Sequence, residues 1–163
     1  KGAVVVCPTD TVYAYVCSAQ NARAIEAIAR LKGTKAQKTN LSLICKDLSQ
    51  LSEYARSITT PAFRTMKKAL PGPYTFIVPA SNEIPKIFKN NKRTVGIRVP
   101  DHPIPLALVE ELGHALVVTS VHDDDELLDF ENVLLTPHIA AQPRFNALND
   151  IADMMIGLEE HMQ

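Results

Sequence analysis

The chain has 163 residues, of which 46% are apolar and 21% are charged, as in an ordinary soluble globular domain with one sizeable core. No apolar run approaches the roughly 18 residues that a membrane-spanning helix needs, so we expect no membrane partner. The three cysteines match no zinc-binding spacing, and their occurrence in apolar runs favours a reducing, cytoplasmic compartment. The first residue is Lys1 rather than Met, from which we expect a short N-terminal piece to be missing.

The formal net charge of −1 conceals a strong asymmetry. Residues 1–100 hold 16 Lys and Arg against 5 Asp and Glu, whereas residues 101–163 hold 1 against 13. Such asymmetry indicates either a basic face that attracts phosphate or nucleic acid, or charge balance between the two halves of one fold. The acidic run at residues 123–126 is typical of a solvated surface, with metal binding as the alternative.

The first apolar run, residues 3–7, predicts a buried strand. It leads into residues 8–13 (Pro-Thr-Asp-Thr-Val-Tyr), which place two hydroxyls, a carboxylate and a phenol at the end of that strand. This segment is either a ligand-binding turn or an ordinary strand end whose Thr and Asp satisfy turn amides. Residues 21–31 then predict a helix, with Asn21 as its N-cap and Gly33 as its stop.

The rest of the first 120 residues continues to alternate between strands and helices. A basic loop covers residues 32–40, helices are predicted at 48–55, 61–69 and 103–112, and strands at 41–45, 74–79, 94–99 and 115–120. The prolines flanking Gly72 predict a turn. This pattern predicts a single-domain α/β fold, on the border of α+β, with a twisted mixed sheet.

Four polar clusters lie at the strand ends or in the loops beside them: Thr9-Asp10-Thr11 with Tyr13, Lys32 with Lys35 and Lys38, Gly72-Pro73-Tyr74-Thr75, and residues 96–100 with Thr119-Ser120. The lysines and Arg98 can neutralise phosphate or carboxylate, and the hydroxyls can orient a ligand. The alternatives are a solvated lysine loop and an ion pair of Arg98 with a carboxylate such as Asp101. Neither a P-loop nor a dinucleotide-binding glycine turn is present in the sequence, so any nucleotide is held in another way.

These segments, in this order, resemble the YrdC-like threonylcarbamoyl-AMP synthase family, which includes paralogues of the YciO type. The resemblance covers about residues 1–128 and rests on several separated motifs, which are Pro-Thr-Asp-Thr-Val-Tyr at 8–13, Leu-Lys-Gly at 31–33, Leu-Ser-Leu-Ile-Cys at 41–45, Leu-Pro-Gly-Pro-Tyr-Thr at 70–75, Val-Gly-Ile-Arg-Val-Pro at 95–100 with Asp-His-Pro at 101–103, and Val-Thr-Ser at 118–120.

The resemblance implies a YrdC/RibB-like twisted sheet with a large, positively charged cavity. It also implies a nucleotidyltransferase that condenses L-threonine, bicarbonate and ATP into threonylcarbamoyl-AMP and pyrophosphate, for threonylcarbamoyl-adenosine formation on tRNA. ATP, accompanied by Mg²⁺, and L-threonine are then the small-molecule partners, and no permanent cofactor is expected. Members are also described as binding double-stranded RNA.

By position, the resemblance places nine residues around the ligands. Thr11 and Thr75 would contact the threonine, and Thr119 and Ser120 would close the pocket. Arg98, Lys32 and Pro71 would lie around the ATP phosphates and the threonine carboxylate, and Lys35 or Lys38 would replace a missing arginine. No catalytic residue or metal ligand is assigned.

The chain departs from the synthase pattern in three places. It reads Lys-Gly-Thr-Lys at 32–35 where synthases have K-x-R-P, Ser-Val-His at 120–122 where they have S-A-N, and Ala-Tyr-Val at 14–16 where they have G-L-G. These changes move the chain toward the YciO-type paralogues.

From about residue 129 a different resemblance begins. Residues 132–139 (Asn-Val-Leu-Leu-Thr-Pro-His-Ile) resemble the C-terminal segment of D-2-hydroxyacid dehydrogenases, in which His138 would be the catalytic histidine. The other dehydrogenase parts are not recognisable, so we interpret residues 129–163 as a strand and a helix packed on the same domain. A chimeric or recombinant chain with no selected activity is therefore the alternative to an enzyme and to an RNA-binding module.

Overall fold

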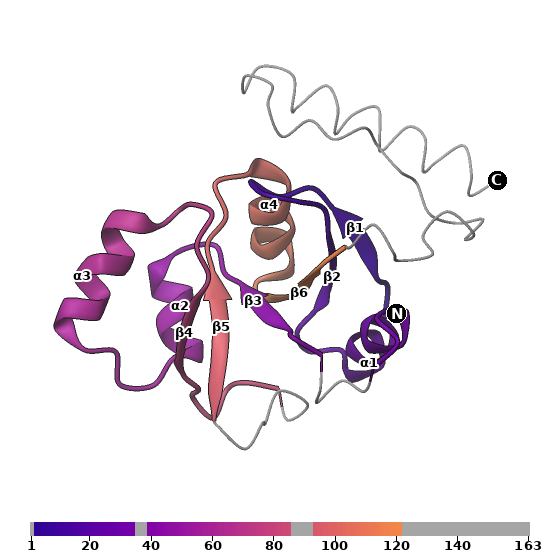
Figure 1. Cartoon of the computed structure of the whole chain (residues 1–163), viewed down its shortest axis with the longest axis horizontal. Coiled ribbons are helices and arrows are strands. Elements are labelled where there is room, and N and C mark those ends of the chain that lie inside the picture. The colour runs from indigo at the N-terminus through magenta and orange to yellow at the C-terminus, as the bar shows by residue number, and fades with distance from the viewer. Residues whose placement is uncertain (1, 35–38, 86–92, 122–163) are drawn as a thin grey trace.

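The computed structural model of the protein describes residues 2–34, 39–85 and 93–121. Within these ranges the chain folds into a sheet of six strands with four helices (Figure 1). The strands are β1 (Val5–Cys7), β2 (Ala14–Ser18), β3 (Ser42–Ile44), β4 (Phe76–Pro79), β5 (Thr94–Arg98) and β6 (Leu116–Ser120). The helices are α1 (Ala22–Leu31), α2 (Leu48–Tyr54), α3 (Thr60–Ala69) and α4 (Pro103–Leu112).

The strand order is β1-β2-β6-β3-β5-β4. The pairs are antiparallel except for β3 and β5, which run parallel. In that parallel pair Ser42 lies opposite Gly96, and Ile44 lies opposite Arg98. The prediction of a mixed sheet with helices in an α/β domain is therefore confirmed.

Local signals place the helix ends where the sequence predicts them. The Asn21 side chain accepts a hydrogen bond from the Ala24 N–H at 3.1 Å and caps α1. Gly33 follows α1 with a φ of +62°, and Gly113 ends α4 with a φ of +69°, a region that glycine enters without a steric penalty. Each of these helix ends is set by residues within one turn of it in the sequence, and such local signals can be predicted without the tertiary structure.

Strand β2 was not predicted from the sequence. All four residues from Ala14 to Cys17 are buried, because both faces of β2 are covered: Tyr15 and Cys17 lie in the cluster on the side of α1, and Ala14 and Val16 in the one under α4. A strand covered on both faces shows no alternation of apolar and polar residues. Residues 14–18 therefore lack the alternating pattern by which a half-buried strand is predicted.

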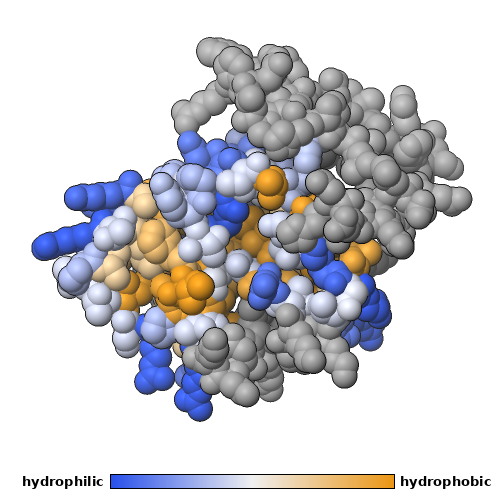
Figure 2. All heavy atoms as spheres, in the orientation of Figure 1, coloured by the Kyte–Doolittle hydropathy of each residue, from blue (hydrophilic) through white to orange (hydrophobic). Residues whose placement is uncertain are grey.

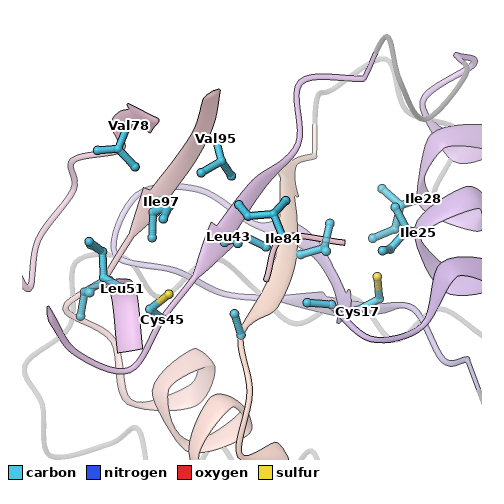
Figure 3. Packing of buried hydrophobic residues seen from close by; sticks show 14 of the residues in the cluster. Cys17, Ile25, Ile28, Leu43, Cys45, Leu51, Val78, Ile84, Val95 and Ile97 are labelled. Atoms are coloured by element: carbon cyan, nitrogen blue, oxygen red, sulfur yellow. The ribbon is translucent and has the colours of Figure 1, made fainter. Parts of the chain in front are cut away.

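The two faces of the sheet are covered differently. One face packs against α1, α2 and α3, with Ile25 and Ile28 beside Cys17 and with Leu51 beside Cys45 (Figure 3). On the other face, α4 covers a smaller cluster that includes Ile44, Leu116 and Val118.

The part of this second face near β4 and β5 has no helix over it among the described residues. We call this uncovered part the open face. It carries Ser42, Thr75, Ile77, Gly96 and Arg98. Ile77 is 77% exposed there, and Figure 2 shows hydrophobic residues reaching the surface over β4 and β5. An exposed strip of strand beside a packed core is a typical place for a ligand or partner.

The predicted strand and helix of the C-terminal segment, including His138, lie outside the described residues, as does the predicted boundary near residue 129. In the part of the chain that the structure describes, no helix is long and apolar enough to cross a membrane.

Candidate functional site

The turn between β1 and β2 is organised by a buried threonine. Thr9 is 3% exposed, and its hydroxyl donates to the Val12 carbonyl at 2.7 Å and accepts from the Thr11 N–H at 3.2 Å. The ordinary strand-end interpretation is therefore right for Thr9, which satisfies turn groups. The Thr11 hydroxyl stays close to this turn, 3.1 Å from Thr9 Oγ1, and the Asp10 carboxylate reaches a more distant partner.

Those two side chains meet Arg98, the last residue of β5. Arg98 Nη2 donates to Asp10 Oδ1 in an ion pair, and Nη1 and Nη2 lie 3.4 and 3.5 Å from Thr11 Oγ1. The side chains of Arg98 and Asp10 are 12% and 9% exposed, so the pair is largely shielded from water. An ion pair for Arg98 was one of the alternatives, and its carboxylate partner is Asp10 rather than Asp101.

Asp101 contributes through its backbone. Its N–H donates to Asp10 Oδ2 at 3.1 Å, so both carboxylate oxygens of Asp10 are engaged. On the other partner, Arg98 Nε is buried and has no hydrogen-bond partner within the described residues. A buried donor without an acceptor is rare in native proteins and calls for an explanation, such as a role in the function of the site.

Thr75 lies on the open face close to Gly96. A Cβ added at Gly96 would come within 3.1 Å of Thr75 Cγ2 and 2.6 Å of Ser42 Oγ. Glycine at this position therefore lets the two hydroxyl-bearing side chains lean over the strand two residues before Arg98. Thr11 and Thr75 both approach the strand that carries Arg98.

Thr119 and Ser120 do not point the same way. Successive residues of a strand face opposite sides of the sheet, and Leu116 and Val118 belong to the α4 side. Ser120 therefore shares the side of Arg98 and is exposed, whereas Thr119 is buried toward the side of α1. The two hydroxyls cannot both face one ligand in this arrangement.

Pro71 lies beside the site, whereas Lys32 follows a helix on the other face of the sheet. Pro71 is exposed and follows a cis peptide bond from Leu70, and the next N–H, of Gly72, donates to the Val99 carbonyl at 2.9 Å. That bond holds the turn directly beside Arg98. Lys32 ends α1, the helix that packs on the opposite face. Lys35 and Lys38 lie outside the described residues.

His102 is a neighbour that the sequence analysis did not assign to the site. Its Nδ1 accepts from the Ile104 N–H at 3.3 Å and caps α4, so this nitrogen carries no proton. Burial lowers the pKa of His102, and the carboxylates of Asp10 and Asp101 oppose that shift. Asp10 was named in the first polar cluster of the sequence but was given no role there, and the structure places it against Arg98.

The three cysteines of the described residues are buried and unpaired. Burial raises the pKa values of Cys7, Cys17 and Cys45 to about 12, so the three thiols stay protonated and inert. No group of three or more His, Cys, Asp or Glu residues is placed to hold a metal ion in the described ranges.

Two hollows among the described residues lie away from Arg98. One, of about 270 Å³, lies between α2 and α4, and the other, of about 350 Å³, lies between α2 and α3. The groups that the structure gathers at Arg98 are its guanidinium, the Asp10 carboxylate and the Thr11 hydroxyl.

The sequence of this chain matches a known protein family and several of its members. The Sua5/YciO/YrdC family, described as "Telomere recombination", matches residues 1–142, which extends past the boundary near residue 129 that we expected. The YciO protein of Escherichia coli K12 is 41% identical over 122 residues, which are 74% of this chain and 58% of that protein. The threonylcarbamoyl-AMP synthase of Halorhodospira halophila is 34% identical over 122 residues, 75% of this chain and 63% of the relative.

Solved structures agree with these sequence matches. The crystal structure of E. coli YciO superposes with a TM-score of 0.69 at 38% identity, covering 77% of this chain and 61% of that one. The P. abyssi Sua5 structure complexed with L-threonine gives 0.67 at 31% identity, covering 73% and 35%. The chain thus spans about 58% of the length of the YciO protein that it matches. The matching motifs, the shared sheet and the extent of the match show that this chain belongs to the Sua5/YciO/YrdC family.

Proposed function

We propose that this chain binds L-threonine and ATP and takes part in forming threonylcarbamoyl-AMP from L-threonine, bicarbonate and ATP. One observation carries the proposal: a shielded guanidinium, that of Arg98, is held against the Thr11 hydroxyl at the edge of an open sheet face. Relatives of this chain include threonylcarbamoyl-AMP synthases and a Sua5 protein with L-threonine bound, which supports the same ligand class here.

The reaction suits such a site because it asks the protein to position reactants and stabilise charge. The threonine amine and bicarbonate form a carbamate with loss of water. A carbamate oxygen then bonds to the α-phosphorus of ATP while the bond to the leaving pyrophosphate breaks. In this proposal Arg98 binds the threonine carboxylate, Thr11 and Thr75 orient the amino acid, and Mg²⁺ arrives with the ATP phosphates.

The remaining assignments belong to the nucleotide part of the proposal. Pro71 fits best, because its turn is bonded to Val99, the residue that follows Arg98. Lys32, Lys35 and Lys38 would meet the phosphates from the loop after α1. Of the two hydroxyls on β6, Ser120 is the one on the side of Arg98, so we assign pocket closure to Ser120 more than to Thr119.

Pyrophosphate release tests this proposal. The protein is incubated with ATP, L-threonine and bicarbonate, and omission of each reactant in turn serves as the control. We expect release only with all three, and loss of release in Arg98→Ala but not in Lys68→Ala, whose side chain is exposed on α3. Release that does not depend on L-threonine would contradict the proposal.

Duplex RNA binding without turnover is a second candidate, favoured by the excess of basic residues in the first 100 positions. Arg64, Lys67 and Lys68 are exposed on α3 and would contribute to a basic face. The affinity for duplex RNA would then fall steeply with salt, with a log–log slope of roughly −0.9 for each phosphate neutralised. A shallow slope would argue against this function.

If the chain is a recombinant product with no selected activity, a third result is expected. Neither pyrophosphate release nor any ligand-induced rise in melting temperature would be seen with ATP or L-threonine. We propose a cytoplasmic location for the working protein, since the three cysteines are buried and unpaired as in a reducing compartment.

A further inference from the structure

Asp10 holds together three segments that are far apart in the sequence. Its Oδ1 accepts from Arg98 Nη2 at the end of β5, and its Oδ2 accepts from the Asp101 N–H just before α4. Asp10 itself stands in the turn after β1, which Thr9 fixes through its hydroxyl. The carboxylate therefore cannot swing away from Arg98 without breaking a second bond.

This arrangement decides where the guanidinium points. With Nη2 held by Asp10, the end of the guanidinium lies against Thr11 Oγ1, and Nε is left buried with no partner among the described residues. An arginine side chain has several freely rotating bonds, and holding it in one orientation before binding removes an entropic cost from the binding step.

Asp10 also changes the electrostatics. The carboxylate offsets the positive charge of Arg98 at short range, in a place where each side chain is about one-tenth exposed. A free cation would attract any anion, whereas a paired guanidinium attracts anions weakly and discriminates by hydrogen-bond geometry.

We propose that Asp10 is a positioning residue, which orients Arg98 toward a ligand carboxylate and lowers the affinity of the site for simple anions. The inference rests on the proposed function for the identity of that carboxylate, L-threonine. Asp10 acts through Arg98 and touches no ligand itself.

Two changes at Asp10 separate orientation from charge. Asp10→Asn removes the negative charge, so L-threonine affinity should fall about tenfold while affinity for inorganic phosphate rises severalfold. Asp10→Glu keeps the charge but displaces the carboxylate by one methylene, so L-threonine affinity should fall without a gain in phosphate affinity. General disruption of the site would lower both affinities, and that result would overturn the proposal.

Asp101→Asn is the matched control. It removes one negative charge from the same neighbourhood and keeps the backbone N–H that binds Asp10. We expect little change in L-threonine affinity. In an Arg98→Ala background, Asp10→Asn should have no further effect on L-threonine, because residues that act through each other are not additive. An equal loss in both backgrounds would show that Asp10 does not act through Arg98.

A measurement without L-threonine separates this inference from the proposed function. Nitrogen-15 spectra should show a protected Arg98 Nε–H resonance in the original protein and in Asp101→Asn, and its loss in Asp10→Asn. If the original protein fails to bind L-threonine, the proposed function is wrong. The Nε–H resonance and the phosphate titrations then still decide the role of Asp10, and an unchanged resonance in Asp10→Asn would refute it.

Discussion

The two faces of the sheet carry different kinds of residue and do different work. The face under α1, α2 and α3 is filled with side chains such as Ile97 and Leu43, both fully buried. The open face, on the same strands, carries a glycine, hydroxyls, an arginine and an isoleucine that is 77% exposed. Alternation along β4 and β5 therefore places stability on one side and the candidate site on the other.

The largest expected difference between the two faces is in the loss of unfolding free energy when an isoleucine on each face is shortened to alanine. Ile97→Ala leaves a cavity in the filled face and should cost about 2–5 kcal/mol of unfolding free energy. Ile77→Ala removes the same atoms from an exposed position and should cost less than about 0.5 kcal/mol. Urea unfolding measures both, and similar losses would mean that the open face is covered in solution.

The next effect concerns the ion pair on the open face. Arg98→Ala leaves the Asp10 carboxylate shielded and unpaired, which should cost about 2–4 kcal/mol, slightly less than for fully buried pairs. Asp10→Ala in the same chain should recover part of that loss in urea unfolding. No recovery would indicate that Arg98 stabilises the fold through its aliphatic part.

The affinity for nucleotide or RNA gives a further test of whether Arg98 belongs to a binding site. Arg98→Ala should weaken nucleotide or RNA binding by more than Lys92→Ala, a change in a segment outside the described residues. Isothermal titration calorimetry with ATP, and filter binding with duplex RNA, measure the two losses. Equal small losses, together with an unchanged affinity for L-threonine, would leave Arg98 as an ion-pair residue and nothing more.

A smaller loss is expected at Gly96. The Cβ of Gly96→Ala would approach Ser42 Oγ to 2.6 Å, but that hydroxyl can rotate, so we expect a cost of about 1 kcal/mol. Ser42→Ala should reduce the cost, and thermal unfolding of the single and double variants checks it. An unchanged cost in the Ser42→Ala background would assign the strain to Thr75 instead.

The smallest effect is a dependence on pH. Because burial lowers the pKa of His102 in the fold, the unfolded chain takes up a proton first as the pH falls. Stability should therefore be full above the ordinary histidine pKa of about 6.5 and decline as the pH falls through that value. His102→Asn keeps an N-cap side chain and should remove this part of the slope between pH 7.5 and 5.5. A slope identical in both proteins would show that His102 does not cause it.

Much of the fold was predictable because its signals are local. The helix N-cap at Asn21, the stop at Gly113 and the proline in the first turn of α3 each depend on residues within one turn. The central strand β2 was missed for the opposite reason. Tyr15 and Cys17 pack on the side of α1, whereas Ala14 and Val16 pack in the cluster under α4, a helix that comes much later in the chain.

The candidate site divides in the same way. The sequence by itself determined that Thr11, Thr75 and Arg98 stand at strand ends or in the turns beside them, since apolar runs and turns set those places. Only the tertiary structure decided that Arg98 pairs with Asp10 instead of its near neighbour Asp101, and that Thr119 and Ser120 face opposite sides. These outcomes depend on which strands become neighbours and in which register, because residues 88 positions apart meet only after the sheet has assembled.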